Sequence, residues 1–172
     1  MKKYLITSNP SYFQLRKYMP DFALYRDKEN ENYALEAQNF VQMCKPIERL
    51  KVFLHQDYNL AAKLGAKGVH LTSQQFDEIP KAKELGLEVI ISTHTHDEVH
   101  IAEAMGADYV TYSPIFASPN KGEPKGVQDL KSIVSMVDIQ VFALGGIVSE
   151  KQIEAVRETD AYGFASIRYF LQ

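Results

Sequence analysis

The sequence predicts a compact α/β fold, a (β/α)₈ barrel of the TIM type. Short apolar runs with strand character alternate with amphipathic helical segments along the whole chain, eight of the former and seven of the latter. Polar residues or glycines follow almost every apolar run. Strands separated by helices form parallel sheets with right-handed crossovers, and eight such units can close into a barrel.

The apolar runs are short, rich in β-branched and aromatic residues, and bounded by turn or polar residues, which is typical of strands in a parallel sheet. In chain order they cover residues 4–7, 22–25, 52–54, 69–71, 89–91, 109–112, 141–144 and 163–167. The second run ends in Arg26-Asp27-Lys28 and the third in His55-Gln56-Asp57. The fifth is followed by Ser92-Thr93-His94, and the seventh ends in Gly145-Gly146.

The intervening segments have helical spacing and recognisable ends. They cover residues 8–18, 33–44, 59–64, 73–85, 97–105, 128–136 and 149–157. Ser and Asn residues cap the first; the second repeats its apolar residues with a period of about 3.6 and stops before Pro46. The third ends at Gly65, Pro80 marks a break or entry turn in the fourth, and Gly106 ends the fifth. The sixth follows the long loop after residue 112, and Ser149 caps the seventh.

No segment remains for an eighth helix, so part of the barrel wall is expected to lack its cover. Tyr169, Phe170 and Leu171 could cover it, or a second subunit could, which makes a homodimer the expected assembly. An open doubly wound sheet is the alternative fold, since strand order cannot be read from sequence. The length of 172 residues suits a single domain covering residues 1–172.

Composition narrows the class of protein. Hydrophobic residues make up 45% and charged residues 24%, which is ordinary for a globular protein. A net charge of −3 argues against nucleic-acid binding. The single cysteine, Cys44, allows no disulfide within the chain and fits a reducing cytoplasm. No apolar window approaches the roughly 18 residues of a membrane span, so a cytoplasmic location is expected.

Residues 106–126, GADYVTYSPIFASPNKGEPKG, form the most informative stretch. A strand-like run ends at Ser113-Pro114 and continues into a loop rich in proline, glycine and lysine. Such a loop is how an α/β barrel places an anion-binding flap over its C-terminal face. Glycines at the end of the seventh run let backbone N–H groups approach a phosphate closely. We therefore interpret the two stretches as two walls of one site.

The candidate site residues are those that follow the strands, because a barrel gathers these ends on one face. They are Arg26, Lys28, His55, Ser92, His94, Ser118, Lys121, Gly145, Gly146 and Arg168. A single cation at a strand end is usually a solvated surface residue. Several cations at successive strand ends, together with a Gly-Gly turn, favour a pocket for a phosphorylated small molecule.

The other histidines are interpreted structurally. His96 and His100 share a helix face, but no third ligand stands at a matching spacing, so a solvated face is favoured over a metal site. His70, between Val69 and Leu71, is expected to be a hydrogen-bonded interior histidine. No metal ligands are predicted.

The chain resembles the thiamine phosphate synthase superfamily, which includes the thiazole tautomerases, over essentially its whole length. The segments that carry the resemblance are FALYRDK, LAAKLGAKGVHL, ISTHTHDEVHIAEAMGADYV, SPIFASPNKG and VFALGGI. It implies a (β/α)₈ barrel that binds a thiazole phosphate or a pyrimidine pyrophosphate. The synthases join the two with Mg²⁺ on the pyrophosphate, whereas the tautomerases isomerise a carboxylated thiazole phosphate without that metal.

The resemblance also implies residue roles. Arg26, Lys28 and Lys121 match the cations that hold the pyrophosphate, and Ser92 matches a serine near the pyrimidine. Gly145 and Gly146 match the turn that binds the thiazole phosphate.

Four positions depart from the family pattern. Gln56 and Gln75 stand where the synthases have the Mg²⁺-binding aspartates, and amides are weak ligands for this ion. Asp57 could replace a lost carboxylate only if the strand register shifted. Arg168 stands where a phosphate-binding serine is expected, and Pro114 where the tautomerases have their catalytic histidine.

The sequence thus leaves several functions open. The first is an enzyme of thiamine biosynthesis, either a synthase that would require Mg²⁺ or a tautomerase whose general base would be His55 or His94. The second is a catalytically silent or regulatory barrel that binds a phosphate ligand. A barrel enzyme acting on another phosphorylated metabolite is the third.

Overall fold

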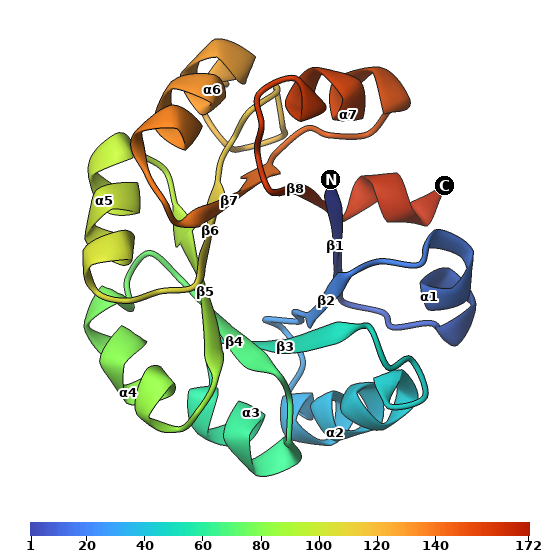
Figure 1. Ribbon diagram of the computed structural model, residues 1–172. Coiled ribbons are helices and arrows are strands. Elements are labelled where there is room, and N and C mark those ends of the chain that lie inside the picture. The colour runs from blue at the N-terminus through green and yellow to red at the C-terminus, as the bar shows by residue number, and fades with distance from the viewer.

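The computed structural model describes residues 1–172 as a closed barrel of eight parallel strands, each hydrogen-bonded to the next and β1 paired with β8 (Figure 1). The strands are β1 (Lys2–Thr7), β2 (Phe22–Tyr25), β3 (Lys51–His55), β4 (Gly68–Leu71), β5 (Glu88–Thr93), β6 (Tyr109–Tyr112), β7 (Gln140–Leu144) and β8 (Gly163–Ser166). The predicted barrel is therefore confirmed, and the open-sheet alternative is excluded.

Seven α-helices surround the barrel, as predicted (Figure 1). They are α1 (Tyr12–Tyr18), α2 (Tyr33–Cys44), α3 (Tyr58–Leu64), α4 (Ile79–Glu84), α5 (His96–Ala104), α6 (Gly126–Met136) and α7 (Glu150–Arg157). The fourth predicted helix is shorter than expected: a 3₁₀ turn, η1 (Phe76–Glu78), precedes α4, and Pro80 lies in the first turn of α4. No helix has both the length and the apolar character needed to cross a membrane.

The alternation of side chains along each strand creates two apolar layers. One face of the strands packs against the helices in a cluster of 36 buried residues. The opposite face fills the barrel interior with nine residues, among them Tyr4, Phe22, Phe53 and Phe142. The interior is therefore a packed core rather than a channel, and it forms a rigid floor for whatever lies at the mouth.

A short 3₁₀ helix, η2 (Arg168–Leu171), follows β8 and lies beside α1 at the position where an eighth helix would pack (Figure 1). Phe170 is buried there, stacked on Phe164 and in edge contact with Tyr18. Gln14 of α1 donates a hydrogen bond to the Phe170 carbonyl at 2.8 Å. Of the three residues expected to cover the wall, Phe170 is buried, whereas Leu171 is largely exposed.

Candidate functional site

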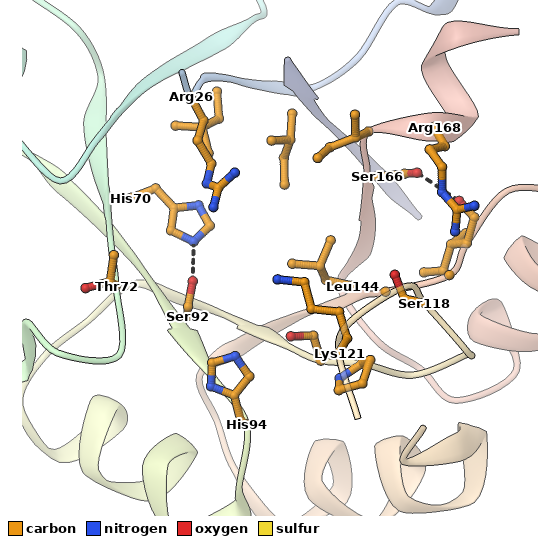
Figure 2. Close-up of a pocket in the computed structure, with 18 of the residues that line it drawn as sticks. Arg26, His70, Thr72, Ser92, His94, Ser118, Lys121, Leu144, Ser166 and Arg168 are labelled. Atoms are coloured by element: carbon orange, nitrogen blue, oxygen red, sulfur yellow. Dashed lines mark hydrogen bonds between the residues drawn. The ribbon is translucent and has the colours of Figure 1, made fainter. Parts of the chain in front are cut away.

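A cavity of about 420 Å³ opens at the C-terminal ends of the strands (Figure 2). Its apolar floor includes Ile6, Leu24 and Leu144, which are carried by β1, β2 and β7. All ten predicted site residues line this cavity: Arg26, Lys28, His55, Ser92, His94, Ser118, Lys121, Gly145, Gly146 and Arg168. The structure thus brings together residues that are up to 142 positions apart in the sequence.

Arg26 and Lys28 enter the cavity from the end of β2. The Arg26 N–H donates to the Thr7 carbonyl at 2.9 Å, which fixes the backbone where the strand ends. Neither cation forms an ion pair with a carboxylate. Their charges therefore remain available to an anionic ligand.

His55 and His70 lie side by side on β3 and β4, where they are register partners. Burial, and then the charges of Arg26 and Lys28, lower the pKa of His55 to about 4. Burial, followed by His55 and Arg26, lowers the pKa of His70 to about 3. Both imidazoles are therefore neutral at physiological pH.

His70 is hydrogen-bonded through both ring nitrogens, as the sequence predicts, but it also lines the cavity, a position that was not predicted. Its Nδ1 lies 2.7 Å from the Tyr4 hydroxyl and its Nε2 lies 2.9 Å from Ser92 Oγ (Figure 2). A neutral imidazole donates from only one nitrogen, so His70 donates to one hydroxyl and accepts from the other. This chain of bonds fixes the orientation of Ser92.

His94 directly follows β5 at the rim of the cavity, and about half of its side chain is exposed. Its backbone N–H donates to Glu98 Oε1 at 3.1 Å. The other two histidines of this region lie outside the cavity. His96 is bonded to Asp129 at 3.0 Å, and His100 is exposed on α5.

The turn after β7 presents unpaired backbone donors to the cavity. Gly145 and Gly146 have φ values of 105° and 69°, in the region that favours glycine. The N–H groups of Gly145, Gly146 and Ile147 donate no hydrogen bond within the protein. Consecutive free N–H groups in such a turn form a concave anion-binding site.

The loop after β6 is anchored at its base and forms the flap over the cavity. The N–H groups of Ile115 and Phe116 donate to the carbonyls of Leu144 and Gly145, each at 3.0 Å. On the returning side, Lys125 N–H donates to the Pro114 carbonyl at 2.8 Å and Gly126 N–H donates to Ile115 at 2.9 Å. The two stretches singled out in the sequence are therefore directly bonded, and Lys121 extends from the flap into the cavity (Figure 2).

Arg168 completes the cavity from the end of β8, across the mouth from Arg26 (Figure 2). Ser166 supports this corner, because its hydroxyl donates to the Ile147 carbonyl at 2.8 Å and accepts from the Tyr169 N–H at 3.1 Å. The cavity therefore has cations and free backbone donors on two sides: Arg26 and Lys28 on one, and the glycine turn with Arg168 on the other. Lys121 reaches in from the flap.

The side chains do not fit the magnesium site that the resemblance implies. Gln75 Oε1 accepts from the Thr72 N–H at 3.0 Å, and Gln75 Nε2 donates to the Gln56 carbonyl at 3.3 Å. Asp57 caps α3, with Oδ1 accepting from the Leu60 N–H at 2.9 Å, and it does not line the cavity. No group of three or more His, Cys, Asp and Glu side chains could hold a metal ion.

Several cavity residues were not predicted from the sequence: His70, Thr72, Ser73, Ser113, Ile147, Ser166 and Ile167. Thr72, Ser73 and Ser113 directly follow β4 and β6, so the strand-end rule applied more strictly would have found them. The inward position of His70 follows from the alternation along β4, because Val69 and Leu71 belong to the outer layer. Nothing in the sequence identifies Ile147, which contributes a backbone group.

Comparison with known proteins gives consistent results. The profile of the family described as "Thiamine monophosphate synthase" matches residues 3–170. A putative thiamine-phosphate synthase 2 from Aquifex aeolicus is 33% identical over 150 residues, covering 86% of this chain and 78% of the relative. The thiamine-phosphate synthase of Latilactobacillus sakei is 31% identical over 166 residues, covering 93% and 71%.

A solved structure is similar over nearly the same length. Thiamine phosphate pyrophosphorylase from Pyrococcus furiosus superposes with a TM-score of 0.81 at 26% sequence identity. The superposition covers 96% of this chain and 85% of that one.

Proposed function

The chain belongs to the thiamine monophosphate synthase family, and we propose on that basis that it is a synthase-like enzyme acting on a thiazole phosphate. The observation that carries this proposal is the convergence of four cations and a glycine turn on one cavity with an apolar floor. The ligand would place its phosphate on the turn and its ring over the floor. The second substrate would be a pyrimidine pyrophosphate.

The glycine turn and Arg168 are the proposed site for the thiazole phosphate. Three free N–H groups, on Gly145, Gly146 and Ile147, suit the oxygens of one phosphate. Arg168 adds a planar guanidinium, which can bind two phosphate oxygens at once. Leu144 lies immediately before the turn, so an apolar ring attached to the phosphate would rest on the floor.

Arg26, Lys28 and Lys121 are the proposed site for the pyrophosphate. When the substrates are joined, the departing pyrophosphate gains negative charge as its bond to the pyrimidine breaks. Cations already placed around it stabilise that charge without reorganising. Ser92, which is fixed by His70, would orient the pyrimidine beside this group.

A thiazole tautomerase is a second candidate, favoured by the amides at positions 56 and 75. Pro114 lines the cavity but cannot transfer a proton, so another residue would have to be the base. His55, with a pKa of about 4, would be a weak base at neutral pH. His94, at the open rim, is therefore the better candidate.

Calorimetric titration with the thiazole phosphate, followed by assays of turnover, tests the proposal. Binding together with release of pyrophosphate when the pyrimidine pyrophosphate is added would support the synthase. Binding with isomerisation of the carboxylated thiazole phosphate, lost in His94→Ala, would instead support the tautomerase. Binding without either reaction would identify a silent or regulatory barrel. Absence of binding would refute the proposed ligand.

Arg168→Ala should weaken binding of the thiazole phosphate by about tenfold or more, the effect expected on losing a charge-assisted hydrogen bond. Arg157→Ala is the matched control, because Arg157 is exposed on α7 and pairs only with Glu154. Equal affinities for the two variants would argue against the assigned phosphate site.

A further inference from the structure

The charged residues that line the cavity are all basic. Among the 21 lining residues are Arg26, Lys28, Lys121 and Arg168, and none is an aspartate or glutamate. The protein as a whole has a net charge of −3. The cavity therefore concentrates positive charge that the rest of the molecule does not share.

The protein itself does not neutralise these four cations. None of them lies within ion-pair distance of a carboxylate, whereas Lys51, Lys67 and Lys83 elsewhere in the barrel each pair with one. A group of unpaired cations in a concave site repels itself and attracts anions, and its field is focused by the low-dielectric walls. The natural counter-charge is a ligand that carries several negative charges.

The positive field acts on a neighbouring strand. Burial is the largest cause of the lowered pKa of His55, and the positive charges of Arg26 and Lys28 lower it further. A divalent cation entering the cavity would meet the same field. Hard cations such as Mg²⁺ are held chiefly through carboxylates and substrate phosphates. The cavity wall has no carboxylate that would offset the repulsion.

The side-chain amide of Gln75 does not replace those carboxylates. The side-chain oxygen of Gln75 already accepts from the N–H of Thr72, and its nitrogen donates to the carbonyl of Gln56. Together these bonds tie the loop after β4 to the end of β3. Withdrawing the oxygen to bind a metal would leave the Thr72 N–H without its acceptor.

We propose that this cavity binds the pyrophosphate group directly through its cations, with no bridging metal ion. Arg26 and Lys28 hold it from the end of β2, and Lys121 closes on it from the flap. The inference rests on the proposed function for the identity of the ligand. It replaces the metal-dependent neutralisation of charge that the family resemblance implies with neutralisation by side chains.

The test is calorimetric titration with inorganic pyrophosphate, once in metal-free buffer, from which a chelating resin has removed divalent cations, and once with excess Mg²⁺. We expect binding in metal-free buffer that weakens as salt is added, and no gain in affinity from Mg²⁺. Mg²⁺ complexes free pyrophosphate and lowers its charge, so it should leave the affinity unchanged or reduce it. Binding that appears only with Mg²⁺, or no binding in either buffer, overturns the proposal.

Variants identify the groups involved. Lys28→Ala and Lys121→Ala should each weaken binding in metal-free buffer by about tenfold or more, as expected for a lost charge-assisted contact. Lys121 lies on the exposed flap, so its removal leaves the barrel intact. Lys63→Ala on α3 removes an equal charge outside the cavity and should bind as the wild type does. Equal losses in all three variants would show that binding reflects overall charge and would refute the site.

The outcome can be separated from that of the proposed function. Pyrophosphate binding in metal-free buffer without any affinity for the thiazole phosphate would uphold metal-free binding and refute the proposed substrate. Binding of the thiazole phosphate with a strict Mg²⁺ requirement for pyrophosphate would do the reverse.

Discussion

Replacing Gly146 by alanine should destabilise the protein through the contact between the glycine turn and the flap. A Cβ atom at this position would lie 2.4 Å from the Ala117 carbonyl oxygen and 2.8 Å from Phe116 Cβ. The backbone angle, φ +69°, adds a second cost. An L-residue in the left-handed region costs about 1–2 kcal/mol, and overpacking adds roughly 1–3 kcal/mol. The expected loss in free energy of unfolding is therefore about 2–5 kcal/mol.

Gly65→Ala is the matched control. Gly65 has a similar φ of +73° at the end of α3, but a Cβ there would meet no atom within 4 Å. This variant should lose only the conformational part, about 1–2 kcal/mol. Urea denaturation of both variants measures the two losses, with unchanged m-values showing that the unfolding remains comparable. Equal losses would refute the claim that the turn and the flap are packed against each other at this point.

The remaining predictions concern buried hydrogen bonds and their pH dependence. Because the pKa of His70 is lowered to about 3 in the fold, stability should fall as pH drops from about 6.5 towards 3, and His70→Gln should flatten this slope in urea titrations across that range. Tyr4→Phe should cost about 1–3 kcal/mol in urea denaturation, because His70 Nδ1 loses its buried partner; a loss equal to that of an exposed Tyr12→Phe control would contradict this. The Tyr109 hydroxyl and Lys51 bond to Glu88 and lower the pKa of its carboxyl. Glu88→Gln should therefore remove stability at neutral pH, and the difference from wild type should shrink as pH falls through the carboxylate range. A constant difference at every pH would refute that charge-based explanation.

Much of the fold and of the cavity could be predicted because the relevant signals are local. Apolar runs alternating with helical segments indicate parallel strands, and a closed barrel necessarily gathers the strand ends on one face. This is why Arg26, Lys121 and Arg168, which are far apart in sequence, could be assigned to one site. The resemblance to a known family then supplied roles that the alternation alone cannot give.

The features that were missed depend on contacts between distant segments. The bond from Gln75 to the Gln56 carbonyl requires the loops after β3 and β4 to lie side by side, which follows from the register of the two strands. Gln75 also accepts from Thr72 and shapes the turn that delays α4, so the predicted helix begins too early. The Ile147 N–H is left without an acceptor because of the path that the backbone takes through the turn. The identity of the residue does not determine that path.

The contrast between the cavity and the outer surface has a practical consequence. Of the 19 Lys and Arg residues, four line the cavity, which leaves 15 to face 22 Asp and Glu residues over the rest of the molecule. An anion-exchange resin should therefore retain the protein through its exterior, whereas the proposed function places small multivalent anions in the mouth of the cavity. Phosphate, sulfate and citrate buffers would occupy the cations and conceal weak ligands. Preparations in a buffer of monovalent salts should present the cavity with its full affinity.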